Sequence, residues 1–200
     1  MKSALITLVA AIILGGAGFY AWKAFSPEPQ PSAPVVVEET RNTYATSTYS
    51  VKYPGNFILN APFAYGAFGP KKPIYGVKFI IPSTVATGTN LSADSGVSVE
   101  QLPRAKNCTG DIYLLASVTA YEVIENGTEY SFASSTGAAA GNLYEEQVYA
   151  LATSSPCTAV RYFIHSTNIG NYPAGMVREF DRAALLSTFD KIRQSLVSGM

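Results

Sequence analysis

The chain has 200 residues, enough for one ordinary domain with an appendage and too few for two full domains. Its 14 basic and 14 acidic residues balance, so no overall field attracts it to nucleic acid, and we expect no nucleic-acid partner. Charged residues make up only 14% of the sequence, whereas Ser, Thr, Asn, Gly and Tyr are plentiful. This composition is typical of an exported, strand-rich domain and not of a highly charged helical cytosolic protein.

The first 24 residues predict a membrane-spanning helix. An uncharged run extends from Ser3 to Trp22 with a lysine on either side, about the length that crosses roughly 30 Å of hydrocarbon. Aromatic residues at its far end are typical of a membrane interface, whereas a cleaved signal peptide has a shorter apolar stretch and a small-x-small exit. We therefore favour an uncleaved single-pass anchor in the inner (cytoplasmic) membrane. Cleavage near Ala17 or Ala24 is the alternative.

Residues 25–42 predict a spacer. The stretch "FSPEPQPSAPVVVEET" contains four prolines, which favour an extended, solvated backbone and cannot nucleate a core. Such a spacer would hold a folded domain clear of the membrane, in the periplasm or outside the cell. No second break in composition interrupts residues 43–197, so we expect a single extracytoplasmic domain there.

Within that domain the pattern mostly predicts strands. Residues 48–54, "TYSVKYP", alternate tyrosine and valine with polar residues before Pro54 and Gly55 end the strand. Further strands are predicted at 74–82, 96–102, 142–153 and 158–167, with a loop at 83–95. Residues 119–134 form the best hairpin signal, because Asn126–Gly127 is a favoured two-residue turn. The pattern predicts a curved, meandering antiparallel sheet.

The clearest helix signal comes last. Asp181 is a suitable cap, and Phe180 and Leu185 have the spacing of a hydrophobic staple. One face of the predicted helix carries Leu185, Phe189, Ile192 and Leu196. We expect that face to pack on the sheet, which makes the fold class α+β: one curved antiparallel β-sheet domain packed by a C-terminal α-helix.

Cys108 and Cys157 are the only cysteines, and each lies in a polar, turn-like stretch. An exported chain with two cysteines favours a disulfide between them. We interpret it as structural, because a redox-active pair is more often spaced Cys-x-x-Cys and a zinc site needs more ligands than one histidine and two distant cysteines. We expect no metal and no cofactor.

Both ends of the domain resemble a known fold. "YSVKYPGNF" and "LLSTFDKIRQSL" are similar to the start and end of exported bacterial domains with the PsbP/MOG1-like fold. Between them "GVKFIIP", "GTNLSADSGVSVE" and "HSTNIGNYPAGMVREFD" resemble a narrower bacterial envelope family that we associate with no established activity. The resemblance implies a fold, an envelope address and a non-enzymatic default. It implies no catalytic residue.

His165 is the only histidine and lies in "IHSTNIGNYP". On a strand, Arg161, Phe163 and His165 would share one face. A hydrolase would need a nucleophile beside His165, but Ser166 is its neighbour and points to the opposite side, and no Gly-x-Ser-x-Gly elbow occurs. We interpret His165 and Asn168 as a polar strand end bonded to loop backbone, and keep contact with a ligand and catalysis as alternatives.

Two other groups of residues bear on function. The stretch 61–76 combines Phe63, Tyr65, Phe68 and Tyr75 with glycines, prolines and two lysines, and predicts a loop that is either a lid on the core or a surface for a partner. Glu145 and Glu146 are adjacent on a predicted strand and should face opposite sides, so we interpret them as solubilising edge charges.

The sequence therefore predicts a membrane-anchored extracytoplasmic binding or assembly module without enzymatic activity. Its partner is unknown, and an envelope protein is one candidate. Its candidate binding residues are Phe63, Tyr65, Phe68, Tyr75, His165 and Asn168. The alternative is a small envelope hydrolase that uses His165.

Overall fold

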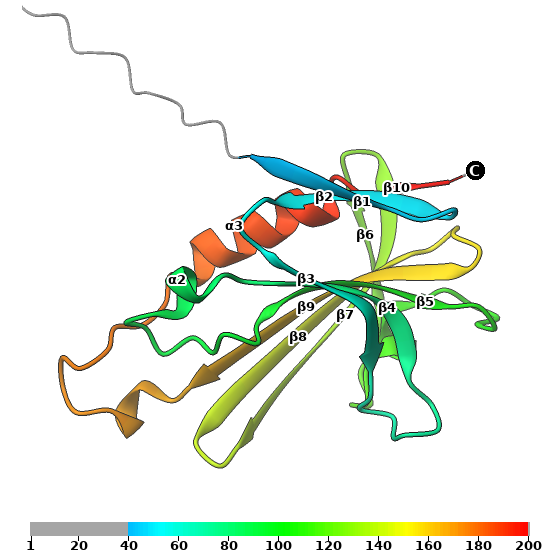
Figure 1. Cartoon of the computed structure of the whole chain (residues 1–200). Coiled ribbons are helices and arrows are strands. Elements are labelled where there is room, and N and C mark those ends of the chain that lie inside the picture. The colour runs from blue at the N-terminus through cyan, green and yellow to red at the C-terminus, as the bar shows by residue number, and fades with distance from the viewer. Residues whose placement is uncertain (1–39, 200) are drawn as a thin grey trace, which may run out of the picture. The chain divides into compact units, whose positions relative to one another are not determined.

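The structure is a computed structural model that describes residues 40–199 (Figure 1). The predicted membrane helix and nearly all of the predicted spacer lie outside these residues. A strand already begins at Arg41, within the last two residues of the range predicted as a spacer. Within residues 40–199, no helix has both the length and the apolar character needed to cross a membrane.

The described chain forms two antiparallel sheets. The larger one has seven strands in the order β3-β4-β5-β9-β8-β7-β6. Their bounds are β3 Ile58–Tyr65, β4 Ile74–Ile80, β5 Gly96–Leu102, β6 Tyr121–Glu125, β7 Thr128–Ala139, β8 Asn142–Leu151 and β9 Cys157–Thr167. The smaller one has the order β1-β2-β10, with β1 at Arg41–Ala45, β2 at Tyr49–Pro54 and β10 at Val197–Ser198. The antiparallel prediction is confirmed, but the strand at residues 48–54 belongs to this second sheet because β1 and β10 pair with it.

The strand predicted at 74–82 is found as β4, which ends at Ile80, and the strand at 96–102 and the hairpin of β6 and β7 are confirmed. Asn126 and Gly127 both have positive φ, as the predicted two-residue turn requires. The stretch 61–76 differs from the expected loop, since it is a hairpin of β3 and β4 with only residues 66–73 between the strands. Pro62 lacks an N–H to donate, and the register of β3 shifts where it occurs, between Asn60 and Phe63.

One face of the large sheet is covered by helix α3, Arg182–Arg193, and by β2 (Figure 1). The helix begins as predicted, because the Asp181 side chain accepts a hydrogen bond from the Ala184 N–H at 2.9 Å. Leu185, Phe189 and Ile192 are buried against valine, tyrosine and phenylalanine side chains of β2, β4, β5 and β9. Together they form the first core and confirm an α+β architecture.

The opposite face of the large sheet has a smaller second core. The 3₁₀ helix η1, Gly110–Tyr113, packs there, and Tyr113 and Leu114 cover Ala133, Val148 and Ala150. Cys108 and Cys157 form the predicted disulfide, with Cα atoms 5.1 Å apart. The Tyr113 hydroxyl donates a hydrogen bond to the Cys157 carbonyl at 2.7 Å. Two short helices, α2 at Ser83–Ala86 and η2 at Ile169–Asn171, lie in the remaining loops.

Gly76 is a point of close approach between β4 and β5. A Cβ atom on Gly76 would lie 2.0 Å from the Val99 carbonyl oxygen, whereas a Cβ on Gly137 of β7 would meet nothing within 4 Å. We predict that Gly76→Ala lowers the free energy of unfolding by about 1–3 kcal/mol through overpacking. Gly137→Ala should change it by less than about 0.5 kcal/mol. Urea unfolding of both variants measures the difference, and equal losses would contradict the close approach.

The disulfide closes a loop with a sequence separation of 49 residues. We predict that Cys108→Ala/Cys157→Ala loses about 4 kcal/mol of unfolding free energy, because the unfolded chain regains the freedom that the bridge removes. The measurement is denaturant unfolding with and without a reductant. The reductant should destabilise the parent protein and leave the variant unchanged, and a reductant effect on the variant would assign the loss to another cause.

Candidate functional site

Strand β9 places its residues on two chemically different faces. Val160, Tyr162 and Ile164 are in the first core. Arg161, Phe163 and His165 lie on the opposite face of the sheet, as the alternation predicts. The second core covers one end of this face. The rest, which we call the open face, carries Lys78 of β4, Ser98 and Glu100 of β5, and Tyr144 and Glu146 of β8.

Arg161 is at the centre of the open face and is only 1% exposed. Its Nε and Nη2 donate to the two carboxylate oxygens of Glu100, each at 2.9 Å, in a bidentate pair. Nη1 donates to Glu146 at 2.5 Å, and Nη2 also donates to the Tyr113 carbonyl at 2.7 Å. Burial alone would lower the pKa of Arg161, but the hydrogen bonds and charge of Glu100 raise it above its ordinary value. Every guanidinium nitrogen thus has an acceptor.

Tyr65 of β3 lies against this ion pair. Its ring centroid is 3.7 Å from Cζ of Arg161, and its hydroxyl donates to Glu146 at 2.9 Å. Burial raises the pKa of the Tyr65 hydroxyl, which therefore stays protonated. On the other side, Ser98 donates its hydroxyl proton to Glu100 at 2.6 Å. Both neighbours are held in one orientation by the carboxylates that bind Arg161.

Lys78 is the second cation of the open face, and it is much less well paired. Its Nζ donates to the Asp94 backbone carbonyl at 2.7 Å and lies 4.6 Å from the ring centroid of Phe163 and 5.7 Å from that of Phe63. Among residues 40–199 it has no second acceptor and no salt-bridge partner. Burial lowers the pKa of Lys78. Two of its three N–H groups are therefore available to another molecule.

Lys78 and Arg161 border a cavity of about 210 Å³, which we call the Lys78 pocket. Three aromatic rings, Phe63, Tyr65 and Phe163, form its apolar walls, and Ser98 and Asp94 add polar atoms. A pocket with apolar walls and a few converging polar groups is the usual form of a binding site. All of its aromatic walls come from strands, so the sheet holds them in place.

His165 lies beside the pocket. Its Nδ1 is 2.9 Å from a carboxylate oxygen of Asp94, its Nε2 is 3.2 Å from Oδ1 of Asn142, and its ring stacks on Tyr144 with centroids 4.6 Å apart. Asp94 is the kind of carboxylate partner that the hydrolase alternative requires for His165. However, Asn142 occupies the side of the imidazole where a nucleophile would lie. Within residues 40–199 no hydroxyl forms a hydrogen bond to the imidazole.

The structure separates the other predicted site residues. Phe63 and Tyr65 line the Lys78 pocket. Phe68 packs edge-on against Tyr65 in the second core, with centroids 6.2 Å apart. Tyr75 is 63% exposed and, by alternation along β4, lies on the α3 side of the sheet. The Asn168 side chain accepts a hydrogen bond from the Gly170 N–H and caps η2, so it is bonded to loop backbone, as interpreted from the sequence.

Glu145 and Glu146 do face opposite sides, but they are not edge charges. Strand β8 lies between β9 and β7, inside the sheet. Glu146 binds Arg161 on the open face, and Glu145 forms an ion pair with Arg182 of α3 on the other. Sequence reasoning also left out Lys78 and Glu100. Their only local signal is a single charge inside an otherwise uncharged strand, which needs a partner when buried.

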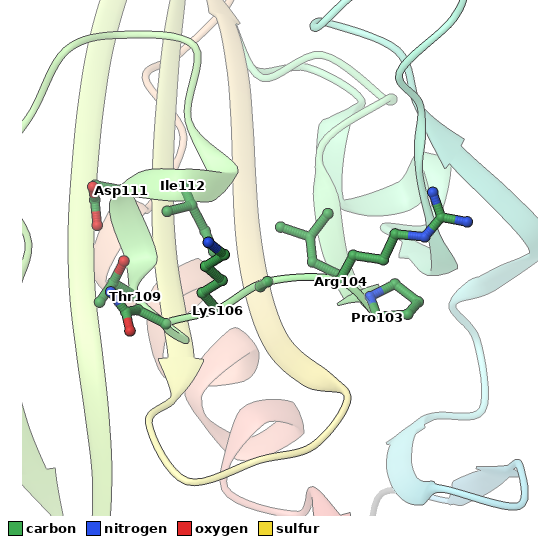
Figure 2. A pocket seen from close by; sticks show the side chains of 9 residues that line it. Pro103, Arg104, Lys106, Thr109, Asp111 and Ile112 are labelled. Atoms are coloured by element: carbon green, nitrogen blue, oxygen red, sulfur yellow. The ribbon is translucent and has the colours of Figure 1, made fainter.

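A larger cavity of about 710 Å³ lies beside the segment 102–112 (Figure 2). All of its lining residues come from that one segment. Figure 2 shows the Lys106 side chain extending toward Ile112, whereas Arg104 extends away toward other strands. Both cations are exposed, and their side chains do not converge. We therefore place the candidate site at the Lys78 pocket.

Comparisons with known proteins add a structural likeness. No protein-family model matches the chain, and no curated protein matches it. The solution structure of cyanobacterial PsbP from Synechocystis sp. PCC 6803 matches with a TM-score of 0.43 and 16% sequence identity, covering 86% of this chain and 100% of that one. The matched protein is a PsbP, and both ends of the domain resemble the PsbP/MOG1-like fold in sequence. At this level of similarity the match transfers no function.

The two Arg–Glu pairs offer a matched test of burial. We predict that Arg161→Met lowers the unfolding free energy by about 3–5 kcal/mol, because it leaves Glu100 buried without its cation. Arg182→Met, which breaks the exposed pair with Glu145, should cost less than about 1 kcal/mol. Denaturant unfolding of both variants gives the comparison. Similar losses would show that Arg161 is not the central contact of the open face.

Proposed function

We propose that this chain is a membrane-tethered, extracytoplasmic binding or assembly module without catalytic activity, and that the Lys78 pocket is its binding site. The tether and the address rest on the apolar run and the proline-rich stretch of the sequence. The disulfide supports an oxidising compartment, where such bridges persist.

One observation carries the binding site, namely the incomplete pairing of Lys78. A half-buried ammonium group without its full set of acceptors is costly, unless water or a ligand supplies the rest. Within the part of the chain that the structure describes, Lys78 has a single acceptor, and it borders a cavity. Arg161, two strands away across β5, has protein acceptors for four of its five N–H groups. The contrast separates a structural cation from one that is free to bind.

The surroundings of Lys78 support binding rather than chemistry. Tyr65 and Ser98 are held in place by Glu146 and Glu100, so the pocket is formed before a ligand arrives. His165, which lies beside the pocket, has both ring nitrogens next to protein oxygens. A preformed pocket without an activated nucleophile suits reversible binding of a ligand that is not chemically altered.

A photo-crosslinking amino acid tests the site in the intact, membrane-tethered protein. We predict that benzoylphenylalanine in place of Phe163 gives one discrete adduct in native cells, and that Lys78→Met in the same chain removes it. The matched control is the same amino acid in place of Tyr75, which is exposed on the other side of the sheet and should not form this adduct.

Two outcomes would overturn the proposal. One is the absence of any adduct at position 163, and the other is the same adduct from both positions, which would indicate unspecific proximity. Circular dichroism of each variant shows whether the domain is still folded, so that a lost adduct is assigned to the pocket.

A further inference from the structure

We infer that the ligand of the Lys78 pocket is an uncharged, polyhydroxylated ring, the group that a saccharide presents. This inference rests on the binding function proposed above and names its ligand class. Three properties of the pocket carry it: the balance of charge, the arrangement of hydrogen-bond donors and acceptors, and the size and apolar walls of the cavity.

The charge balance disfavours an anion. Two cations, Lys78 and Arg161, stand against three carboxylates, Glu100, Glu146 and Asp94, in or directly behind the pocket wall. Arg161 already binds Glu100, Glu146 and the Tyr113 carbonyl through four of its five N–H groups, so it has at most one N–H left for a ligand. A carboxylate or phosphate would have Lys78 as its single free cation and would approach two or more negative groups. His165 faces Asp94 and not the cavity.

The hydrogen-bond pattern favours hydroxyl groups. Lys78 offers N–H donors, whereas Ser98, which gives its proton to Glu100, and Asp94 offer acceptors. A carboxylate can only accept, so it would place its oxygens against those of Ser98 and Asp94. An ammonium group can only donate and would face Lys78. Adjacent hydroxyls of one ring both accept and donate, and they satisfy both sets.

The walls and volume fit a single ring. Phe63, Tyr65 and Phe163 present apolar surface on which the C–H face of a sugar ring can pack. The cavity of about 210 Å³ corresponds to roughly seven water molecules at their share of liquid volume. That is room for one six-membered ring and not for two. Because the pocket opens on the sheet surface, a longer chain could continue out into solvent.

Saturation-transfer NMR on the full chain in lipid nanodiscs tests the ligand class. The neutral probes are glucose, galactose, N-acetylglucosamine and a disaccharide of each, and the charged probes are benzoate and glycerol phosphate. We predict saturation of ring C–H protons for at least one neutral saccharide and none for the charged probes. Its affinity should stay constant from about 50 to about 500 mM NaCl, because screening does not act on an uncharged ligand.

Variants assign the binding to the pocket. Lys78→Met and Phe163→Ala should each weaken saccharide binding by about tenfold or more, since each removes a direct contact. Tyr75→Ala, an exposed aromatic on the other side of the sheet, should leave it unchanged. Saccharide binding that survives both pocket variants would overturn the inference.

Two further results would also overturn it: binding of benzoate or glycerol phosphate but of no saccharide, and binding of no probe at all. Failure of the ligand class and failure of the function are distinguishable. A protein adduct at position 163 without saccharide binding leaves the binding module standing and removes only the saccharide. If neither the adduct at position 163 nor saccharide binding is observed, both the proposed binding function and the saccharide ligand are refuted.

Discussion

The guanidinium of Arg161 connects more parts of this domain than any other polar group we describe. It binds Glu100 of β5 and Glu146 of β8 on the two neighbouring strands, and the ring of Tyr65 from β3 packs against its face. It also donates to the Tyr113 carbonyl at the end of η1. A buried cation requires its acceptors, and those acceptors position the elements that carry them. The second core and the pocket wall both depend on this contact.

The two faces of the large sheet differ in composition and in how far they are covered. The α3 face carries the larger apolar core, with residues such as Phe79, Val97 and Phe189. The open face is covered only in part, and it carries a fully buried ion pair as well as a partly exposed lysine. The larger apolar core is thus on one face, and the other face can retain a half-buried lysine that would be costly in that core.

Much of the fold follows from local patterns. The cap at Asp181, the turn at Asn126 and the alternation along β9 are short-range signals, and all three are confirmed. The hairpin of β3 and β4 was missed because Pro62 and the surrounding glycines are typical of loops and conceal the alternation. The first strand overlaps the end of the predicted spacer at Arg41 and Asn42, and its sequence RNTYA lacks the alternation that indicates a strand.

The site is less predictable for a different reason. Phe63 and Tyr65 were found because aromatic residues in a glycine-rich stretch are conspicuous. The groups around them come from distant positions: Arg161 and Glu100 are 61 residues apart, and Arg161 and Glu146 are brought together only by strand order. A single charge in an apolar strand indicates that a partner exists, but pairing of β5 with β9 decides which one.

The order of the seven strands leaves β3 and β6 as outer edges. Each carries a feature that hinders another chain from pairing with it. The register of β3 breaks at Pro62, and β6 carries Glu122 and Glu125 along its short length. Proline and charge at sheet edges discourage aggregation between copies. Neighbouring molecules crowded on one surface would therefore stay separate, and each would keep its own pocket accessible.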